Sequence, residues 1–194
     1  MNQKNIKPAS FLLVLLLSSE VFALNTPDNS QFQVAQNNIA APLNLPVSQA
    51  QVQARDGSFM LTLPVGWVKT AILPGTNATV QLNVANFSKD ISVSVSTANT
   101  ADIQDMEAWS RGLQARLAAT LTLSTSTPFQ RIKVNGFDGL RAEVAGVQNG
   151  ARFHYLLTVL RGDKCVVYFL SSAFESQFSA SRSDFEQVVN GIQF

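Results

Sequence analysis

The spacing of apolar side chains separates predicted strands from predicted helices along the chain. Apolar and polar residues alternate in residues 58–63, 79–86 and 91–97, which is typical of strands with one buried face. Four further apolar runs predict a meander of strands, at residues 129–134, 140–147, 151–160 and 165–171. Turn signals separate these runs. The pair Asn149-Gly150 is the strongest, because it suits a two-residue hairpin loop.

Helical spacing of three and four residues occurs twice. The first stripe predicts a helix between the two groups of strands: Met106, Trp109, Leu113, Leu117 and Leu121. We expect Asp102 to cap this helix, with Asp105 and Glu107 favoured by its positive end. The second stripe predicts a closing helix: Phe174, Phe178, Phe185, Val188, Val189 and Ile192. A serine-rich stretch, residues 179–183, predicts that its first turn is separate.

The order of these elements predicts the fold class. About three strands, a helix, four strands and a helix follow one another, which indicates an α+β layer architecture. We therefore expect an antiparallel sheet of about six or seven strands flanked by helices. The helices have to cover sheet faces, because their apolar stripes are unstable in water.

The N-terminal residues have the three-part pattern of a secretion signal. Lys4 and Lys7 precede the apolar run of residues 11–17, and Val21-Phe22-Ala23 suits a signal peptidase. The apolar run is much shorter than the roughly 20 residues that span a bilayer. We therefore predict a signal peptide over residues 1–23, cleaved after Ala23, and no membrane span afterwards. Leu24 stands where a lipoprotein has Cys, so the predicted mature protein is periplasmic or secreted without a lipid anchor.

Composition changes again before the predicted domain. Residues 24–55 are rich in Asn, Gln, Ser, Ala and Pro and have weak periodicity, so they are predicted to be a flexible polar leader. Residues 56–194 are predicted to form one α+β domain. About 140 residues are enough for a core, since domains commonly have about 100–150 residues.

Charge and cysteine content exclude several classes of protein. Charged residues are 14% of the chain, and removal of residues 1–23 leaves basic and acidic residues equal in number. This balance argues against nucleic acid or an anionic membrane as a partner. The single cysteine, Cys165, excludes an internal disulfide and is predicted to be a small core residue.

Several segments resemble the PsbP-like superfamily. Four segments carry the resemblance. The first two are residues 59–67, which end in LPVGW, and the predicted central helix with its tryptophan. The other two are residues 134–142, where a glycine follows Asn135 and another follows Asp138, and the strand at residues 164–172, which precedes a Phe-rich helix. The superfamily includes an extrinsic photosystem protein, a nuclear-import factor that binds a small GTPase, and DcrB-like bacterial envelope proteins. The resemblance implies an α/β/α sandwich over residues 56–194. It implies no shared reaction.

The search for catalytic chemistry gives one candidate. His154 is the only histidine, and on a regular strand it points the same way as Arg152 and Leu156. Its expected position is at the surface or a sheet edge, with a Cys165–His154 pair as a remote alternative. Zinc and calcium spacings and the common nucleotide and hydrolase motifs are absent from the sequence. We therefore predict no cofactor and no enzyme activity.

Three residues are the candidate binding surface: Trp67, His154 and Arg152. Trp67 is beside a turn, so it suits a binding groove as well as a core, whereas Trp109 is expected in the core. The leading hypothesis is an exported, non-enzymatic accessory domain that presents a sheet face or groove to an envelope protein. One alternative is a carrier of a small apolar ligand in a Phe/Trp-lined cavity. Another is a weak hydrolase that uses His154.

Overall fold

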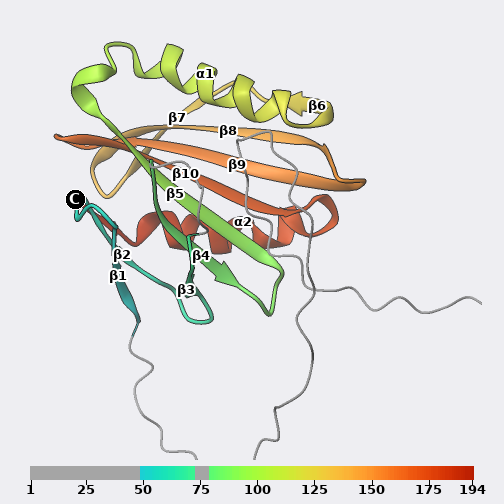
Figure 1. Cartoon of the computed structure of the whole chain (residues 1–194), viewed down its shortest axis with the longest axis horizontal. Coiled ribbons are helices and arrows are strands. Elements are labelled where there is room, and N and C mark those ends of the chain that lie inside the picture. The colour runs from blue at the N-terminus through green and yellow to red at the C-terminus, as the bar shows by residue number, and fades with distance from the viewer. Residues whose placement is uncertain (1–48, 73–78) are drawn as a thin grey trace, which may run out of the picture.

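The computed structural model describes residues 49–72 and 79–194. These residues form two antiparallel sheets and two α-helices (Figure 1). The larger sheet has eight strands in the order β3-β4-β5-β10-β9-β8-β6, with β7 also paired to β8, and the smaller sheet has the order β1-β2-β11. The elements are β1 (Gln51–Gln53), β2 (Met60–Thr62), β3 (Val68–Thr70), β4 (Val80–Asn86), β5 (Ile91–Asn99), the 3₁₀ helix η1 (Thr100–Asp102), α1 (Met106–Ala119), β6 (Thr122–Ser126), β7 (Gln130–Val134), β8 (Phe137–Gln148), β9 (Ala151–Arg161), β10 (Cys165–Phe174), α2 (Glu175–Asn190) and β11 (Ile192–Gln193).

The predicted fold class is confirmed. The seven predicted strands correspond to β2, β4, β5, β7, β8, β9 and β10. The sequence pattern missed β1, β3 and β11, which have only two or three residues each, and β6, whose five residues are all exposed. A strand without a buried face has no alternation to detect. The predicted hairpin turn is also confirmed, with Asn149 and Gly150 at positive φ and Gln148 paired with Ala151.

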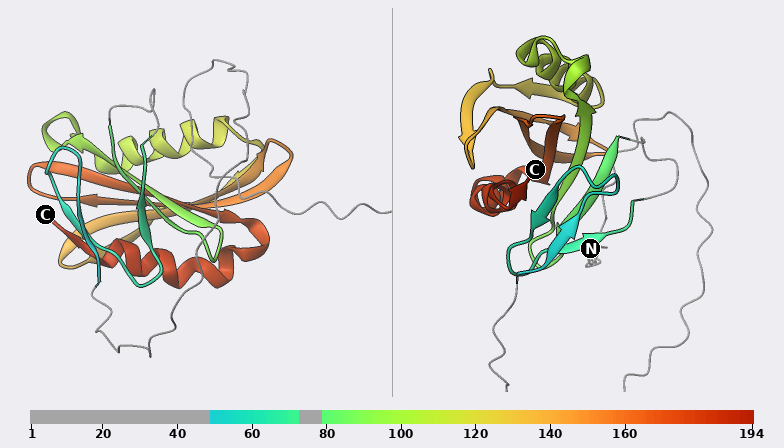
Figure 2. Two further views of the ribbon diagram at one scale, coloured as in Figure 1. Left: turned by 60° about the horizontal axis from the view of Figure 1, so that its bottom comes forward. Right: turned by 90° about the vertical axis from the view of Figure 1, so that its left-hand side faces the viewer.

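The middle of the large sheet is covered on both faces. Helices α1 and α2 lie on opposite sides of it (Figure 2). Residues 155–160 of β9 are six consecutive buried positions, which is the pattern of a strand buried on both faces. Their side chains point alternately toward the two helices, so β9 contributes to both halves of the core.

Helix α1 packs on one face through the predicted stripe. Met106, Trp109 and Leu113 contact an apolar cluster that includes Leu140 and Val159. The rest of the stripe belongs to a neighbouring cluster formed by Leu117, Leu121, Val144 and Tyr155. The placement of Trp109 in the core is confirmed, with its ring edge-on to Tyr168 at 5.6 Å between centroids.

Helix α2 and the small sheet close the opposite face. The buried residues of α2 are Phe178, Ser181, Phe185, Val188 and Val189. The four apolar residues among them join a cluster to which β2, β4, β5, β9, β10 and β11 also contribute. Buried apolar side chains in this arrangement stabilise a fold by roughly 1.5–3 kcal/mol each relative to exposure.

Two predicted helix features are wrong in detail. Asp102 lies in η1, and the cap of α1 is Asp105, whose Oδ1 accepts hydrogen bonds from the backbone N–H groups of Glu107 and Ala108 at 2.9 and 3.0 Å. Helix α2 is also continuous across residues 179–183. Ser181 is buried against the sheet, so packing overrides the weak helix propensity of serine at this point.

The start of the domain lies earlier than predicted. Strand β1 is within the range assigned to the leader, yet it pairs with β2, and Ala54 after it is buried. The folded chain therefore includes residues 51–55 and does not begin at residue 56. The predicted signal peptide, residues 1–23, and most of the predicted leader, residues 24–48, lie outside the described residues.

Cys165 has the predicted position in the core. It is buried at the start of β10 and belongs to the cluster under α2. Burial is the largest cause that raises the pKa of its thiol, with a smaller contribution from the charge of Asp56. A raised pKa keeps the thiol protonated and poorly nucleophilic at neutral pH.

A pair of glycine substitutions tests the packing of α1 on the sheet. A Cβ at Gly146 would lie 2.8 Å from the Leu121 Cβ, so we expect Gly146→Ala to destabilise the protein by about 1–3 kcal/mol. Gly112 lies within α1, where an added Cβ meets only the Arg116 side chain at 3.7 Å. Gly112→Ala should therefore stabilise by up to about 1 kcal/mol. Urea unfolding of both variants measures this. Destabilisation of equal size by the two substitutions would contradict the packing described here.

Candidate functional site

Strand β8 presents polar residues on one face and apolar residues on the other. Leu140, Ala142 and Val144 are buried on the α1 side. Arg141 and Glu143, which alternate with them, point toward the α2 side. Helix α2 packs over β9 and β10, so β8 lies beside it and not beneath it. The α2-side face of β8 therefore collects polar side chains at the margin of the core.

His154 is part of this polar margin. It lies opposite Ala145 of β8, two positions along the ladder from the pair of Glu143 and Leu156. Its Nε2 is 3.0 Å from the Glu143 Oε2, and its ring stacks on Phe178 of α2 with the centroids 3.6 Å apart and the planes 5° from parallel. Of the two expected positions, the sheet edge is wrong, because β9 is an interior strand; the side chain is 21% exposed and lies at a surface hollow. The predicted direction, shared with Arg152 and Leu156, is confirmed.

Glu143 connects His154 to a chain of charged residues. The Arg182 Nη1 donates to the Glu143 Oε1 at 2.6 Å, and the Arg182 Nε lies 3.7 Å from the Glu186 Oε1. Arg141 donates to the same Glu186 oxygen at 2.7 Å. The chain alternates in charge and joins β8, β9 and α2. We call Arg141, Glu143, His154, Arg182 and Glu186 the margin network.

A small hollow opens beside the margin network. Its volume is about 130 Å³, and its lining consists of Thr125, Ser126, Thr127, Glu143, Ala145 and His154. Thr127 is fixed to β8, because its N–H donates to the Glu143 carbonyl at 3.0 Å and its Oγ1 accepts from the Glu143 N–H at 2.9 Å. The hollow thus combines hydroxyl groups, an imidazole and a carboxylate. It suits a hydrogen-bonding group of modest size.

Arg152 flanks the same face at the start of β9. Its guanidinium pairs with Glu175 at the start of α2 through two hydrogen bonds, one of which joins Arg152 Nη2 and Glu175 Oε1 at 3.2 Å. The hydrogen bond from Arg152 holds the pKa of Glu175 below its usual value. Both side chains are largely exposed, so this pair adds little stability.

The assignment of Trp67 to the binding surface is wrong. Its side chain is only 4% exposed, because it packs edge-on against Phe185 in the core, with the centroids 6.4 Å apart. Phe185 contacts Phe178, and the His154 ring stacks on Phe178. Trp67 and His154 are therefore the two ends of a series of aromatic contacts. One end is buried, and the other is at the hollow.

Four of the phenylalanines fill the core instead of lining a pocket. Phe59, Phe169, Phe178 and Phe185 are 0–3% exposed. Three surface hollows formed by described residues have neither Phe nor Trp in their linings. The structure therefore gives the apolar-carrier alternative no site within these three hollows.

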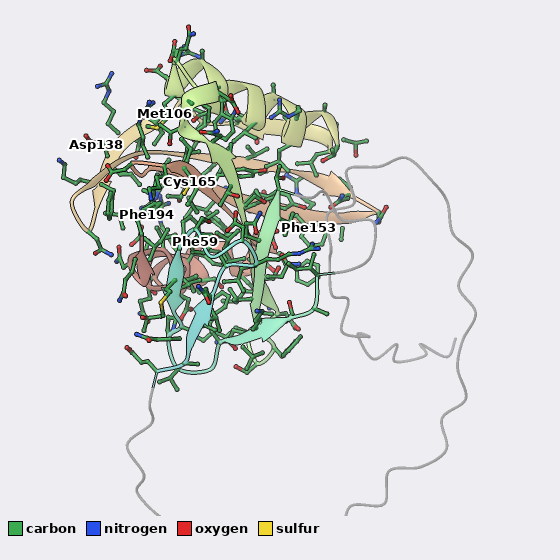
Figure 3. The ribbon with its side chains drawn as sticks, turned by 60° about the vertical axis from the view of Figure 1, so that its left-hand side comes forward. Phe59, Met106, Asp138, Phe153, Cys165 and Phe194 are labelled. Carbon is green, nitrogen blue, oxygen red and sulfur yellow. The ribbon has the colours of Figure 1, made fainter. Side chains whose placement is uncertain are left out.

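The Cys–His alternative is contradicted by the strand register. His154 is opposite Ala173 of β10, and Cys165 lies eight residues before Ala173. At about 3.3 Å per residue the two side chains are about 26 Å apart. Figure 3 shows Cys165 well away from Phe153, the residue next to His154.

The margin network contains only part of a hydrolytic relay. A Ser–His–carboxylate relay needs a nucleophilic hydroxyl on the imidazole nitrogen that the carboxylate leaves free. Within the described ranges, Glu143 is the hydrogen-bond partner shown for His154. These same ranges contain no group of three His, Cys, Asp or Glu residues suited to a metal ion. They also contain no helix with the length and apolarity to cross a membrane.

Sequence reasoning missed most of the margin network. The signal for Glu143 was present, because the Asn149-Gly150 turn fixes the register of β8 and β9 and so places Glu143 near His154. Arg182 and Glu186 gave no such signal. Their positions depend on how α2 is rotated on the sheet, and its buried phenylalanines determine that rotation.

Sequence comparisons and structural comparisons give different results. No known family matches the sequence, and no curated protein is detectably similar to it. The solution structure of cyanobacterial PsbP (CyanoP) from Synechocystis is similar, with a TM-score of 0.58 at 12% identity over 79% of this chain and 97% of that one. A Bacteroides thetaiotaomicron crystal structure gives a TM-score of 0.51 at 8% identity, over 76% of this chain and 48% of that one.

An antiparallel sheet with one helix on each face places the chain among the α+β sandwiches. The similarity to CyanoP is more specific, because it covers almost the whole of that protein. This chain therefore has the PsbP-like fold that its sequence resembled. LpqN of Mycobacterium tuberculosis, which is involved in cell envelope biogenesis, is similar at a TM-score of 0.48 and 10% identity over 75% of this chain and 89% of that one.

Two acidic residues of β8 test whether the margin network stabilises the fold. Glu143 bonds to two partners and is 21% exposed, whereas Asp138 forms one pair with Lys133 and both of those side chains are mostly exposed. We expect Glu143→Ala to lower the free energy of unfolding by about 1–3 kcal/mol. Asp138→Ala should change it by less than about 1 kcal/mol. Denaturant unfolding measures both values, and equal losses would show that the network has no special weight.

Proposed function

We propose that this chain is an exported, non-enzymatic accessory domain of the cell envelope that binds another protein. The proposed contact surface is the hollow beside β6 together with the margin network and Arg152. The observation that carries the proposal is the accessible polar hollow next to a free sheet edge of the described residues. The protein would act by presenting this rigid surface, since its side chains come from paired strands and a packed helix.

Three features support binding over catalysis. The hollow is small and open, which suits one side chain of a partner better than an enclosed substrate. The margin network pairs its charges internally, so a partner would be recognised by hydrogen bonding and shape. The PsbP-like fold is compatible with an accessory role, although fold alone determines no function.

Export is part of the proposal and has a direct test. A signal peptide cleaved after Ala23 leaves a mature chain that starts at Leu24. The chain recovered from the envelope fraction of its own cells should give the N-terminal sequence LNTPD by Edman degradation. Ala23→Asp should block cleavage, because the peptidase requires a small residue there. A purified chain that retains Met1 and remains in the cytoplasmic fraction would contradict export.

Protein binding is tested by site-specific photo-cross-linking in the same cells. We expect a photoreactive residue at Thr127, beside the hollow, to give one discrete cross-linked species of increased mass. The control position is Lys69, which is also exposed but lies on β3 at the opposite edge of the sheet. Mass spectrometry of the product identifies the partner.

The response to substitution separates specific binding from chance contact. Glu143→Ala should reduce cross-linking from Thr127 several-fold, because it removes a carboxylate that lines the hollow and holds His154 there. Products of equal yield at Thr127 and Lys69, or a yield that Glu143→Ala leaves unchanged, would count against the proposed surface.

A further inference from the structure

Strand β6 is an uncharged edge of the large sheet. Among the described residues it pairs only with β8 and ends the order of the large sheet. The other edge segments carry exposed cations: Lys69 is in β3, and Arg131 and Lys133 are in β7. Residues 121–129 contain no charged side chain. Charged residues are a common protection against pairing between sheet edges, and β6 lacks this protection.

Leu123 gives a second, independent observation at the same edge. The register of β6 with β8 shifts between Thr122 and Thr125, and within this bulge Leu123 has φ of 51°. A left-handed conformation costs a bulky residue about 1–2 kcal/mol. The Leu123 side chain is also 78% exposed. A strained, exposed leucine on an uncharged edge marks this bulge as a candidate contact point.

The hydrogen-bonding groups available at this edge follow from the pairing with β8. Thr127 donates its N–H to β8, and Thr125 lies opposite Ala145 in the same ladder. Because these groups alternate in direction along a regular strand, Ser126 turns its N–H and C=O groups away from β8, and so does the C=O group of Ser124, which precedes Thr125. These two residues can pair with a further antiparallel strand.

We propose that β6 pairs with β6 of a second copy of this chain, which joins the two large sheets into one. A second copy fits because the edge is uncharged, so two identical edges meet without repulsion, and because antiparallel pairing of identical strands gives a closed twofold dimer. The proposed dimer rests on the proposed binding function in one respect, because β6 borders the surface proposed above to bind a protein.

The residues of β6 define the register of the pair. Ser124 opposite Ser126 of the second copy uses every outward group, and it places Thr125 opposite Thr125. A shift toward the C-terminus would bring in Pro128, which has no N–H to donate. A shift toward the N-terminus would require the bulge at Leu123 to form regular pairs.

The dimer would complete the hollow beside the margin network. Thr125 lies opposite Ala145 and therefore points to the same face as His154. In the proposed register the Thr125 side chain of the second copy stands about 4.5–5.5 Å away, measured between Cβ atoms. It would wall the open side of the hollow, and the two hollows would lie on the same face of the joined sheet.

Charge substitutions at the edge test the dimer. Light scattering after size-exclusion chromatography of the purified chain should give twice the chain mass, with the dimer fraction increasing with concentration. The double variants Ser124→Lys/Ser126→Lys and Ser124→Glu/Ser126→Glu should each give the single mass, because like charges then face each other. An equimolar mixture of the two should restore the doubled mass. Restoration excludes misfolding as the reason for the loss.

Disulfide cross-linking tests the register. Thr125→Cys should form a covalent dimer under mild oxidation, because opposed residues without mutual hydrogen bonds lie about 4.5 Å apart between Cα atoms, within the range of a disulfide. The native Cys165 is buried and gives a low background. Lys69→Cys, exposed on β3, is the matched control and should stay monomeric.

The outcomes separate the dimer from the proposed function. A wild-type chain that keeps the single mass up to its solubility limit, or a Thr125→Cys yield equal to that of Lys69→Cys, overturns the dimer. A different protein cross-linked from Thr127 by a monomeric chain overturns the dimer and supports the proposed function. A dimer without any other cross-linked protein supports the dimer and contradicts the proposed function.

Discussion

Burial of β9 and β10 on both faces is the constraint on which the rest of the structure depends. Six consecutive buried residues in β9 leave no polar face, so a helix is needed on each side of the sheet. Helix α1 satisfies this on the side of Val144 and Tyr155, and α2 satisfies it through Phe178 and Phe185. Because α2 is centred on β9 and β10, it leaves one face of β8 at the margin of the core.

The candidate site follows from that geometry. Alternation along β8 gives α1 an apolar surface and leaves Arg141 and Glu143 on the other side, beside α2 and not under it. At this margin, charges are partly shielded from water and therefore pair with each other. His154 is fixed between Phe178 and Glu143 in the same way.

The parts that could be predicted from the sequence are those governed by local pattern. Alternation located the long strands, and the stripe beginning at Met106 located α1, because each element buries a face of its own. Strand β6 and the role of Trp67 could not be predicted in this way. An edge strand such as β6 is defined by its neighbour β8, and the burial of Trp67 depends on Phe185, which is more than a hundred positions away in the chain.

The margin network and the β6 edge differ in their content of charged residues. The margin network concentrates charge and satisfies it internally, so removal of one member leaves its partners unpaired. The β6 edge excludes charge, although Lys69, Arg131 and Lys133 show that the other edge segments of this sheet carry it. An uncharged edge, with Leu123 held in a strained conformation, is better explained by a partner strand than by exposure to water. The hollow lies where the two regions meet, so a second copy at the edge would turn a surface depression into a walled site.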